Sequence, residues 1–213
     1  MSVWWPYAVC GAIGYLLGSL PTGLVVGRLA RGIDVRQYGS GKTGFTNVVR
    51  TIGVRWGALV LAVDLAKGAG PVVIARLLSD EPYVQAIAGL AAVAGHDWPV
   101  YVGFRGGRGV ATSYGAALAM NPIASLAVLP AGIALVGVTR IMSVMSVGMA
   151  PVLAVVFVAL AVAGVDPWAY AVYAIVAAAL LIVLHRENVR RLLAGTEPKI
   201  GRGGERRAEP PPV

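Results

Sequence analysis

Long apolar runs constrain the fold of this chain more than any other feature. Five of them cover residues 8–27, 56–75, 122–139, 144–165 and 168–184. Each approaches the ~20 residues that an α-helix needs to cross ~30 Å of hydrocarbon. Because the runs are continuous rather than alternating, they predict helices and exclude a β-barrel. Two shorter apolar runs, 83–95 and 110–120, flank a glycine-rich basic loop, so we expect seven membrane helices in an all-α protein.

The composition indicates a single polytopic domain over residues 1–200. Only 13% of the residues are charged, whereas a soluble domain averages about 25%. Residues 201–213 are rich in Arg, Glu, Gly and Pro, which predicts a disordered tail. The first seven residues contain no Lys or Arg, so the first run is expected to be a membrane helix rather than a signal peptide. The single cysteine, Cys10, is expected to fill space between helices or face lipid.

The basic residues orient the chain. Of its 18 Lys and Arg, 16 fall in residues 28–55, around residue 105, at residue 140 or after residue 185. With seven spans, all of these places lie on one side of the membrane. The positive-inside rule puts that side in the cytoplasm, with the N-terminus outside and the C-terminus inside. Attraction to anionic headgroups accounts for several of these charges without any further function.

Three of the basic segments have a composition that topology does not require. They cover residues 32–53, 95–112 and 185–200, and they interleave Arg with Gly, Ser, Thr and Asn. These residue types donate hydrogen bonds to phosphate oxygens. The first contains "GSGKTGFTN" at residues 39–47, but Arg36 stands where a nucleotide-binding P-loop needs its first glycine. We therefore expect phosphate binding in glycine-rich cytoplasmic loops, without a nucleotide.

The loop between the two short apolar runs is expected to dip into the membrane. Helices that end at Gly95 and begin again at Gly109 would be only about 12 residues, or roughly 18 Å, long. Irregular backbone at that depth survives where it is buried in protein or lines a wet cavity. The alternative is one continuous helix that kinks at Pro99. In both cases Arg105 and Arg108 would lie near the lipid boundary, as a substrate with an apolar tail and a charged head requires.

Few residues offer catalytic chemistry. Asp64 and Lys67 lie three positions apart on one helix face and could neutralise each other, either as a structural clamp or as support for the site. The chain contains no G-x-S-x-G nucleophile motif, and its two histidines are His96 and His185. No carboxylate cluster suggests Mg²⁺ or Zn²⁺, so neither a metal nor a cofactor is expected.

Five segments resemble, in order and spacing, the bacterial membrane acyl-phosphate:glycerol-3-phosphate acyltransferases, the PlsY family. They are "GSLPTG" from Gly18, "GSGKTGFTN" with Arg50, "DLAKG" from Asp64, "GHDWPVYVGFRGGRGVAT" from Gly95 and "HRENVRRLLAGTE" from His185. The resemblance runs from Gly18 to Ile200. It implies transfer of an acyl chain from acyl phosphate to the 1-hydroxyl of glycerol 3-phosphate. The products are lysophosphatidic acid and inorganic phosphate, in the first step of phospholipid synthesis at the bacterial cytoplasmic membrane.

The resemblance also implies roles for residues at matching motif positions. Those expected to hold glycerol 3-phosphate are Ser40, Arg50, Arg108, Ser143, His185 and Asn188, of which Ser40, His185 and Asn188 are the candidate catalytic residues. Those expected to cradle the acyl phosphate are Gly39, Gly41, Thr46, Asn47, Gly106 and Gly107. Glu197 would brace the third segment against an arginine. Besides its two substrates and the lipid bilayer, the protein would meet the soluble enzyme that supplies acyl phosphate; no nucleic acid is expected to bind.

The sequence leaves two candidates for the group that accepts the proton of the attacking hydroxyl. The acceptor is either His185 or the donor phosphate, and His185 could instead be only a helix C-terminal cap.

Lys42 stands where the family usually has Asn, and Phe45 where it usually has Ala, while Arg105 and Arg108 replace the commoner Lys. The competing functional class is a transporter for a phosphorylated small molecule, which broken helices and buried charges would also suit.

Overall fold

A computed structural model describes residues 4–207 of the chain. Helices account for nearly all regular structure within that range, and the one β-contact there is an isolated bridge between Tyr38 and Arg206. The α-helices in chain order are α1 Trp5–Gly18, α2 Thr22–Arg31, α3 Phe45–Ile52, α4 Val54–Leu78, α5 Pro82–Asp97, α6 Val110–Met120, α7 Pro122–Thr139, α8 Met142–Val162, α9 Trp168–Leu184 and α10 Arg186–Leu193. Short 3-10 turns cover Val35–Gln37 and Val100–Val102. The prediction of an all-α fold is confirmed.

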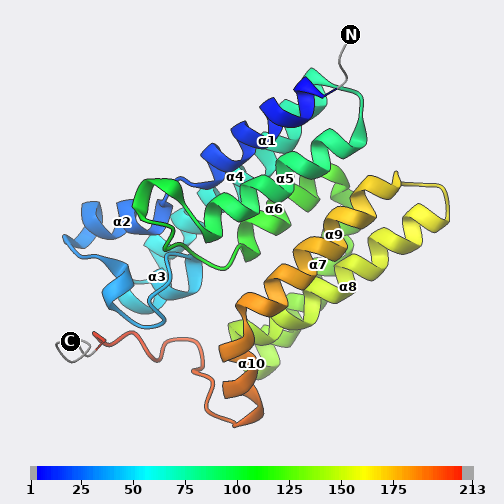
Figure 1. The fold of residues 1–213 in the computed structure, drawn as a ribbon. Helices are drawn as coiled ribbons and strands as arrows, with labels where there is room; N and C mark the ends of the chain where they lie inside the picture. Colours follow the sequence, from blue (N-terminus) through cyan, green and yellow to red (C-terminus); the bar gives the residue numbers. More distant parts are fainter. Residues whose placement is uncertain (1–3, 208–213) are drawn as a thin grey trace.

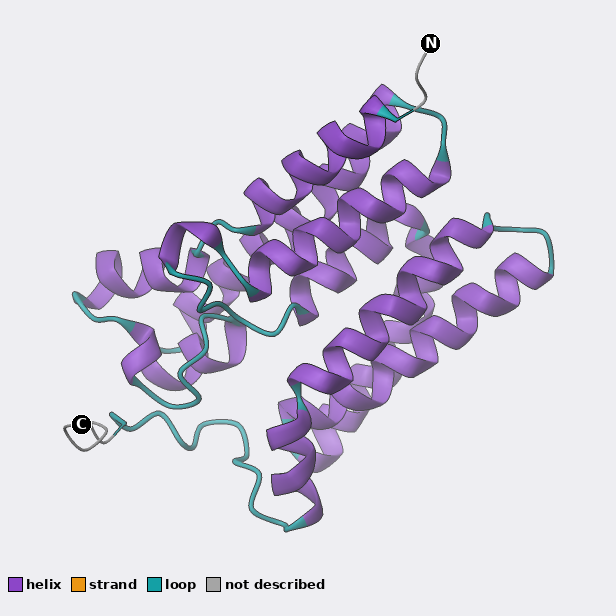
Figure 2. Cartoon of the chain, in the orientation of Figure 1, coloured by secondary structure: helices purple, strands orange, loops and turns teal. Residues whose placement is uncertain are grey.

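The long helices run along a common direction, and the glycine- and arginine-rich segments gather at one end of the bundle (Figures 1 and 2). At that end lie α2, α3 and α10, together with the loop between α5 and α6 and the C-terminal segment. The short turns after α4 and α8 lie at the opposite end. The fold therefore brings the three basic segments together, although they are far apart in the sequence.

Helix length supports part of the predicted span count. Within residues 4–207, four segments are long and apolar enough to cross a membrane: Trp5–Arg31, Val54–Leu78, Pro122–Thr139 and Met142–Val162. A fifth crossing is possible if α9 and α10, which meet at an angle of 61°, form one broken span. Helices α5 and α6 have 16 and 11 residues and are shorter than each of these four segments. Seven crossings and their orientation remain a prediction.

The first apolar run, predicted as one uninterrupted segment, is divided between two helices. It is broken between α1 and α2 at residues 19–21. Pro21 has no backbone N–H to continue the helix, and its φ of −85° and ψ of 64° are not helical. The carbonyl of Leu20, which this break frees, accepts a hydrogen bond of 2.9 Å from Lys67 Nζ in α4. A buried charge thus stabilises the break that lets α2 leave the bundle.

The loop between α5 and α6 separates two short helices, as predicted, and the alternative of one helix kinked at Pro99 is wrong. Helix α5 continues to Asp97, two residues beyond the predicted end. Left-handed backbone at Gly103, Phe104 and Gly109 then prevents helix from continuing. The amides of Gly106 and Gly107 donate to the carbonyls of Asp97 and His96, which caps the end of α5.

Glycines let the central helices approach so closely that their backbones touch. A Cβ on Gly68 of α4 would collide with the carbonyl oxygen of Thr112 in α6. Likewise, a Cβ on Gly115 of α6 would collide with the carbonyl oxygen of Leu65 in α4. Gly14 and Gly18 of α1 approach the backbone of α5 in the same way. Small residues that allow such contact are typical of membrane helix interfaces, because lipid offers no hydrophobic drive for association. This packing fixes α4 and α6, both of which contribute to the site.

Replacing Gly68 with Ala should therefore destabilise the protein, while the same change at Gly70 in the same helix should not. Overpacking costs about 1–3 kcal/mol, and a Cβ on Gly70 would meet no heavy atom of residues 4–207 within 4 Å. Gly70→Ala should even be slightly stabilising, since Ala is favoured over Gly in helices by roughly 0.5–1 kcal/mol. Thermal unfolding in detergent measures both, and equal melting temperatures for the two variants would contradict the close contact.

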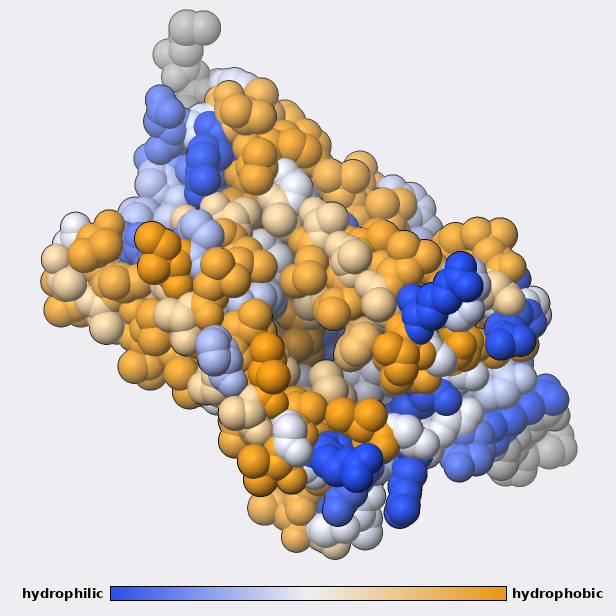
Figure 3. Space-filling model, turned by 180° about the vertical axis from the view of Figure 1, so that it is seen from behind, coloured by the Kyte–Doolittle hydropathy of each residue, from blue (hydrophilic) through white to orange (hydrophobic). Residues whose placement is uncertain are grey.

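The outer surface matches a lipid environment. Figure 3 shows hydrophobic side chains over much of the face turned towards the viewer, with hydrophilic groups gathered towards the ends of the molecule. Large apolar side chains such as Ile123, Val138 and Val155 are 82%, 86% and 67% exposed. A soluble protein avoids contiguous apolar surface of this extent, because water solvates it poorly.

Candidate active site

A cavity of about 520 Å³ connects the loop end of the molecule with the interior of the bundle. Its polar wall comes from the three basic segments and from the start of α8. The residues on that wall are Ser40, Lys42, Thr46, Asn47, Arg50, Arg108, Ser143, His185, Asn188 and Glu197. Its other wall is mainly apolar and comes from α4, α6, α7, α8 and α9, with Asp64 of α4 and His96 of α5 also bordering the cavity. The structure thus places Arg50, Arg108 and Asn188 around one cavity, as the sequence predicts.

Two arginines, together with Lys42, give the polar wall its positive charge. Arg50 and Arg108 each have a buried Nε without a hydrogen-bond partner, and neither forms an ion pair within residues 4–207. Burial lowers the pKa of both guanidinium groups, yet arginine remains charged near neutral pH. Arg50 is held by a hydrogen bond of 3.0 Å from Nη2 to the carbonyl of Pro198. Cations that are half-buried and uncompensated favour binding of an anion.

Glu197 fixes the side chains that surround these cations. Its buried carboxylate accepts hydrogen bonds from Ser143 Oγ at 2.8 Å, Asn188 Nδ2 at 2.6 Å and Arg191 Nε at 2.7 Å. Burial acts to raise the pKa of Glu197, but these hydrogen bonds and the charge of Arg191 outweigh it and lower that pKa. The carboxylate therefore stays ionised and ties the start of α8 to α10. Asn188 Oδ1 is buried on the cavity wall and has no hydrogen-bond partner among the described residues.

His185 lies at the bend between α9 and α10. Its Nδ1 is 2.8 Å from the carbonyl oxygen of Leu181. Because a carbonyl only accepts, Nδ1 carries the proton and Nε2 is the basic nitrogen of the neutral ring. His185 caps a helix end, as one reading of the sequence holds, and it also lines the cavity.

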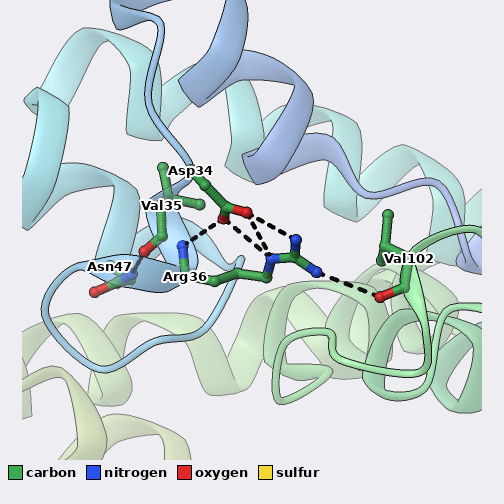
Figure 4. A network of polar contacts seen from close by, with 5 residues as sticks. All are labelled: Asp34, Val35, Arg36, Asn47 and Val102. Carbon is green, nitrogen blue, oxygen red and sulfur yellow. Dashed lines mark hydrogen bonds and ion pairs between the residues drawn. The ribbon is translucent and has the colours of Figure 1, made fainter. Parts of the chain in front are cut away.

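The first glycine-rich loop is organised by Asn47 and by an ion pair next to it (Figure 4). Asn47 Nδ2 donates to the carbonyls of Val35, Tyr38 and Lys42 at 2.9, 3.2 and 2.8 Å. Its Oδ1 accepts from the backbone amide of Ser40 at 2.9 Å. The polar atoms of Asn47 thus bind the loop itself, although the residue lines the cavity.

The ion pair connects this loop with the second one. Asp34 accepts from Arg36 Nη2 at 2.7 Å, and Arg36 Nη1 donates at 3.3 Å to the carbonyl of Val102 (Figure 4). The side-chain hydrogen bond from Arg36 lowers the pKa of Asp34 despite its partial burial. Two of the three basic segments are therefore held together by a charged contact beside the cavity.

Four glycines expected to cradle a phosphate with their amides do not line the cavity. The amide of Gly39 donates to the carbonyl of Glu205, and that of Gly41 donates to Tyr38. The amides of Gly106 and Gly107 cap α5, as described above. Gly39 and Gly41 have φ values of 52° and 70°, which favour glycine, and Gly39 lies directly against Asn47. Whether these residues contact a ligand stays a prediction.

The segment after α10 packs onto the first loop. The amide of Arg207 donates to the carbonyl of Gln37, and Gly204 lies against the backbone carbonyl of Arg50. These contacts concern residues 201–207; residues 208–213 of the predicted tail lie outside the described residues. The division of the chain at residue 200 stays a prediction.

Changing Asn47 to Asp should destabilise the first loop. The substitution replaces a donor that faces three carbonyl oxygens with an acceptor, and a buried unsatisfied polar group costs about 1–3 kcal/mol. The same amide-to-carboxylate change at the exposed Gln37 of this loop should have little effect. Thermal unfolding in detergent compares the two variants, and equal stability would show that the hydrogen bonds of Asn47 contribute nothing net.

Asp64 and Lys67 form a buried ion pair of 3.0 Å in α4. Asp64 Oδ1 is also 3.7 Å from His96 Nδ1 in α5, and both Asp64 and His96 line the cavity. Lys67 does not line it but holds the helix break at Leu20. Within this pair, Lys67 therefore has a structural role, while Asp64 borders the cavity.

Several cavity residues were not identified by the sequence argument. Lys42, treated as a departure from the family pattern, lines the cavity, where burial lowers the pKa of its ammonium group. Met142, Met145 and Met149 of α8 line the apolar wall. Their spacing of three and four places them on one helix face, which is the signal that could have found them. Among the described residues, no group of three or more His, Cys, Asp or Glu side chains could hold a metal ion.

Fold and site define the class of protein: a polytopic membrane protein whose cavity joins a cationic end to an apolar interior. The family model described as Glycerol-3-phosphate acyltransferase matches residues 8–195. The chain belongs to the glycerol-3-phosphate acyltransferase family, a family of transferases. This membership favours an acyltransferase over a transporter.

Relatives and solved structures agree over nearly the whole chain. It is 43% identical over 194 residues to a glycerol-3-phosphate acyltransferase of Synechococcus sp. (strain CC9902), covering 91% of this chain and 95% of that one. It is 44% identical over 189 residues to one of Rubrobacter xylanophilus, covering 89% and 92%. A crystal structure of PlsY, an integral membrane glycerol 3-phosphate acyltransferase in its glycerol 3-phosphate form, superposes with a TM-score of 0.83 at 38% identity, covering 92% and 96%. A second PlsY structure, in the lysophosphatidic acid form, gives a TM-score of 0.80 at 36% identity.

Proposed function

We propose that the protein transfers an acyl chain from acyl phosphate to the 1-hydroxyl of glycerol 3-phosphate, releasing lysophosphatidic acid and inorganic phosphate. The observation that carries this proposal is the single cavity with one cationic and one apolar half. Its cationic half suits the phosphate of either substrate, and its apolar half suits an acyl chain. The two related PlsY structures are in a glycerol 3-phosphate form and a lysophosphatidic acid form, which correspond to the acceptor and the product of such a reaction.

The reaction needs no covalent acyl-enzyme, because phosphate in the donor is already a good leaving group. The 1-hydroxyl oxygen attacks the carbonyl carbon of the donor, a C–O ester bond forms, and the bond to the phosphate oxygen breaks. The electron pair leaves with the phosphate, while Nε2 of His185 accepts the hydroxyl proton and later returns it to phosphate or solvent. Holding both reactants in one cavity removes most of the entropic cost of their meeting.

The basic wall would hold the two phosphate groups and stabilise the charge that develops. Arg50 and Arg108 supply charge. Thr46 and Lys42 border the same space and suit the donor phosphate, while Ser40, which also lines it, would hold glycerol 3-phosphate. Asn47 supports that part of the site through its hydrogen bonds to the loop rather than by contacting substrate.

In the membrane, the proposal puts the basic end in the cytoplasm. Seven crossings, made by α1, α4, α5, α6, α7, α8 and α9, would then leave the N-terminus outside and the C-terminus inside. The short α5 and α6 would end below the lipid surface, with the loop between them packed against protein. A cavity open to the cytoplasmic membrane of a bacterium would receive acyl phosphate from a soluble supplier and glycerol 3-phosphate from the cytosol.

Purified protein in detergent tests this function directly. Hexadecanoyl phosphate and glycerol 3-phosphate should yield inorganic phosphate and lysophosphatidic acid in equal amounts, with neither product formed when glycerol 3-phosphate is omitted. Hexadecanoyl coenzyme A supplied in place of the acyl phosphate should not support turnover. Reaction with the thioester alone would contradict the donor, and activity that requires a sealed vesicle would indicate transport.

A further inference from the structure

The apolar half of the cavity runs along α9 to a definite depth. The α9 residues on its wall, with the bend residue after them, are Tyr173, Ala174, Ala177, Ala178, Leu181 and His185. Positions 173 and 185 differ by twelve residues, which is roughly 18 Å at 1.5 Å per residue. Helix α8 contributes a parallel series that begins at Met142 and ends at Leu153. The small alanine side chains of α9 leave room for this part of the cavity, and the proposed reacting end lies beside His185.

A layer of large side chains closes the cavity at its apolar end. Tyr173 is the last α9 residue on the wall, and Leu153 is the last of α8. One turn further, Tyr170 and Phe157 are 7% and 0% exposed, do not line the cavity and belong to the packed core. The space therefore ends where α9 changes from alanine to tyrosine.

Tyr173 is held rigidly in this layer. Its side chain is 1% exposed, and its hydroxyl donates to the carbonyl of Ser113 in α6 at 2.8 Å. The ring also packs against Gly89 of α5. A side chain fixed by helices on both sides cannot yield to a longer ligand as an exposed side chain would.

We propose that Tyr173 forms the floor of an acyl-chain pocket and sets the longest chain that the enzyme accepts. This inference rests on the proposed function, in which the donor's chain occupies the apolar half of the cavity. A chain that reaches the floor fills the space, and each further methylene must displace a fixed ring. Steric limits of this kind discriminate between ligands that differ only in length.

Two substitutions move the floor in opposite directions. Tyr173→Ala removes the ring and should deepen the pocket. Ala177→Leu adds bulk one helical turn closer to His185 and should make the pocket shallower, since Ala177 is 5% exposed and lines the cavity. Tyr173→Phe is the matched control, because it removes the hydrogen bond to Ser113 and keeps the ring.

The experiment measures kcat/KM in detergent for dodecanoyl, hexadecanoyl and eicosanoyl phosphate with glycerol 3-phosphate. Each variant is judged by the ratio of its long-chain to its short-chain values, so a change in the amount of folded protein cancels. Tyr173→Ala should raise the eicosanoyl-to-dodecanoyl ratio by about tenfold or more, and Ala177→Leu should lower the hexadecanoyl-to-dodecanoyl ratio by a similar factor. Tyr173→Phe should leave both ratios unchanged.

Other outcomes would overturn the inference. Unchanged ratios in Ala177→Leu, or in Tyr173→Ala where it folds, would mean that the chain leaves the cavity sideways into lipid before it reaches the floor. The same ratio change in Tyr173→Phe as in Tyr173→Ala would assign the effect to the hydrogen bond rather than to the ring. If the unmodified protein turns over no acyl phosphate, the proposed function fails and this inference fails with it; if it turns them over with unchanged ratios in the variants, only the inference fails.

Discussion

Arg108→Ala is expected to lower kcat/KM for acyl transfer by about 10²–10³, the range found when one electrostatic donor is removed from an active site. Arg108 lines the cavity, its Nε is buried without a partner, and no carboxylate pairs with it in the described part of the chain. Its charge is therefore free to stabilise phosphate. Initial rates at varied concentrations of each substrate measure the effect.

Arg105 is the matched control for this prediction. It lies three residues away in the same loop, carries the same charge, is exposed and does not line the cavity. Arg105→Ala should change kcat/KM by less than about threefold, because exposed charges are screened by solvent and salt. Arg108→Lys should retain much of the activity by keeping the charge. Equal losses in Arg105→Ala and Arg108→Ala would mean that only the overall charge of the loop matters.

His185→Ala and His185→Asn should each lower kcat by about 10²–10⁴, the usual contribution of a general base. The two variants separate the possible roles of the residue. An asparagine amide can still donate a hydrogen bond to the Leu181 carbonyl, which accepts one from Nδ1 of His185 in the unmodified protein. It has no basic nitrogen to replace Nε2. Loss of activity in both variants, with melting temperature preserved in His185→Asn, would assign the base function to Nε2.

Near-normal turnover by His185→Asn would have a different meaning. The histidine would then be a helix cap only, and the donor phosphate would be the proton acceptor, as the sequence alternative allows. Single-turnover measurements at saturating substrate distinguish this result from a change in substrate binding, because they report the chemical step.

Much of the site was predictable because its signal is local. Arg50, Arg108 and Asn188 lie in segments that mix arginine with small hydrogen-bonding residues, and the structure places all three around one cavity. The helix break at Pro21 and the saturation of the Asn47 side chain were not predicted. Both depend on partners elsewhere, namely Lys67 for the Leu20 carbonyl and three loop carbonyls for Asn47.

The apolar wall shows the same division. Hydrophobicity made α8 and α9 recognisable as apolar helices, yet alanines and methionines that face a cavity do not differ in hydropathy from those on the outer surface. Only the packing of Tyr173 against Gly89 and Ser113 reveals where the space ends. Helix faces can be assigned from periodicity, but the depth of a cavity between them depends on how several helices meet.

By itself, the sequence determined the apolar helices, the concentration of positive charge in a few short segments and the family. These follow from the free energy of placing each short stretch in lipid or water and from motifs that are read residue by residue. The tertiary structure decided which amides and side chains were left free to bind substrate and how deep the cavity reaches. The reason is physical: a hydrogen-bond donor such as the Gly39 amide is available or occupied according to a distant carbonyl, here that of Glu205, which only folding brings near.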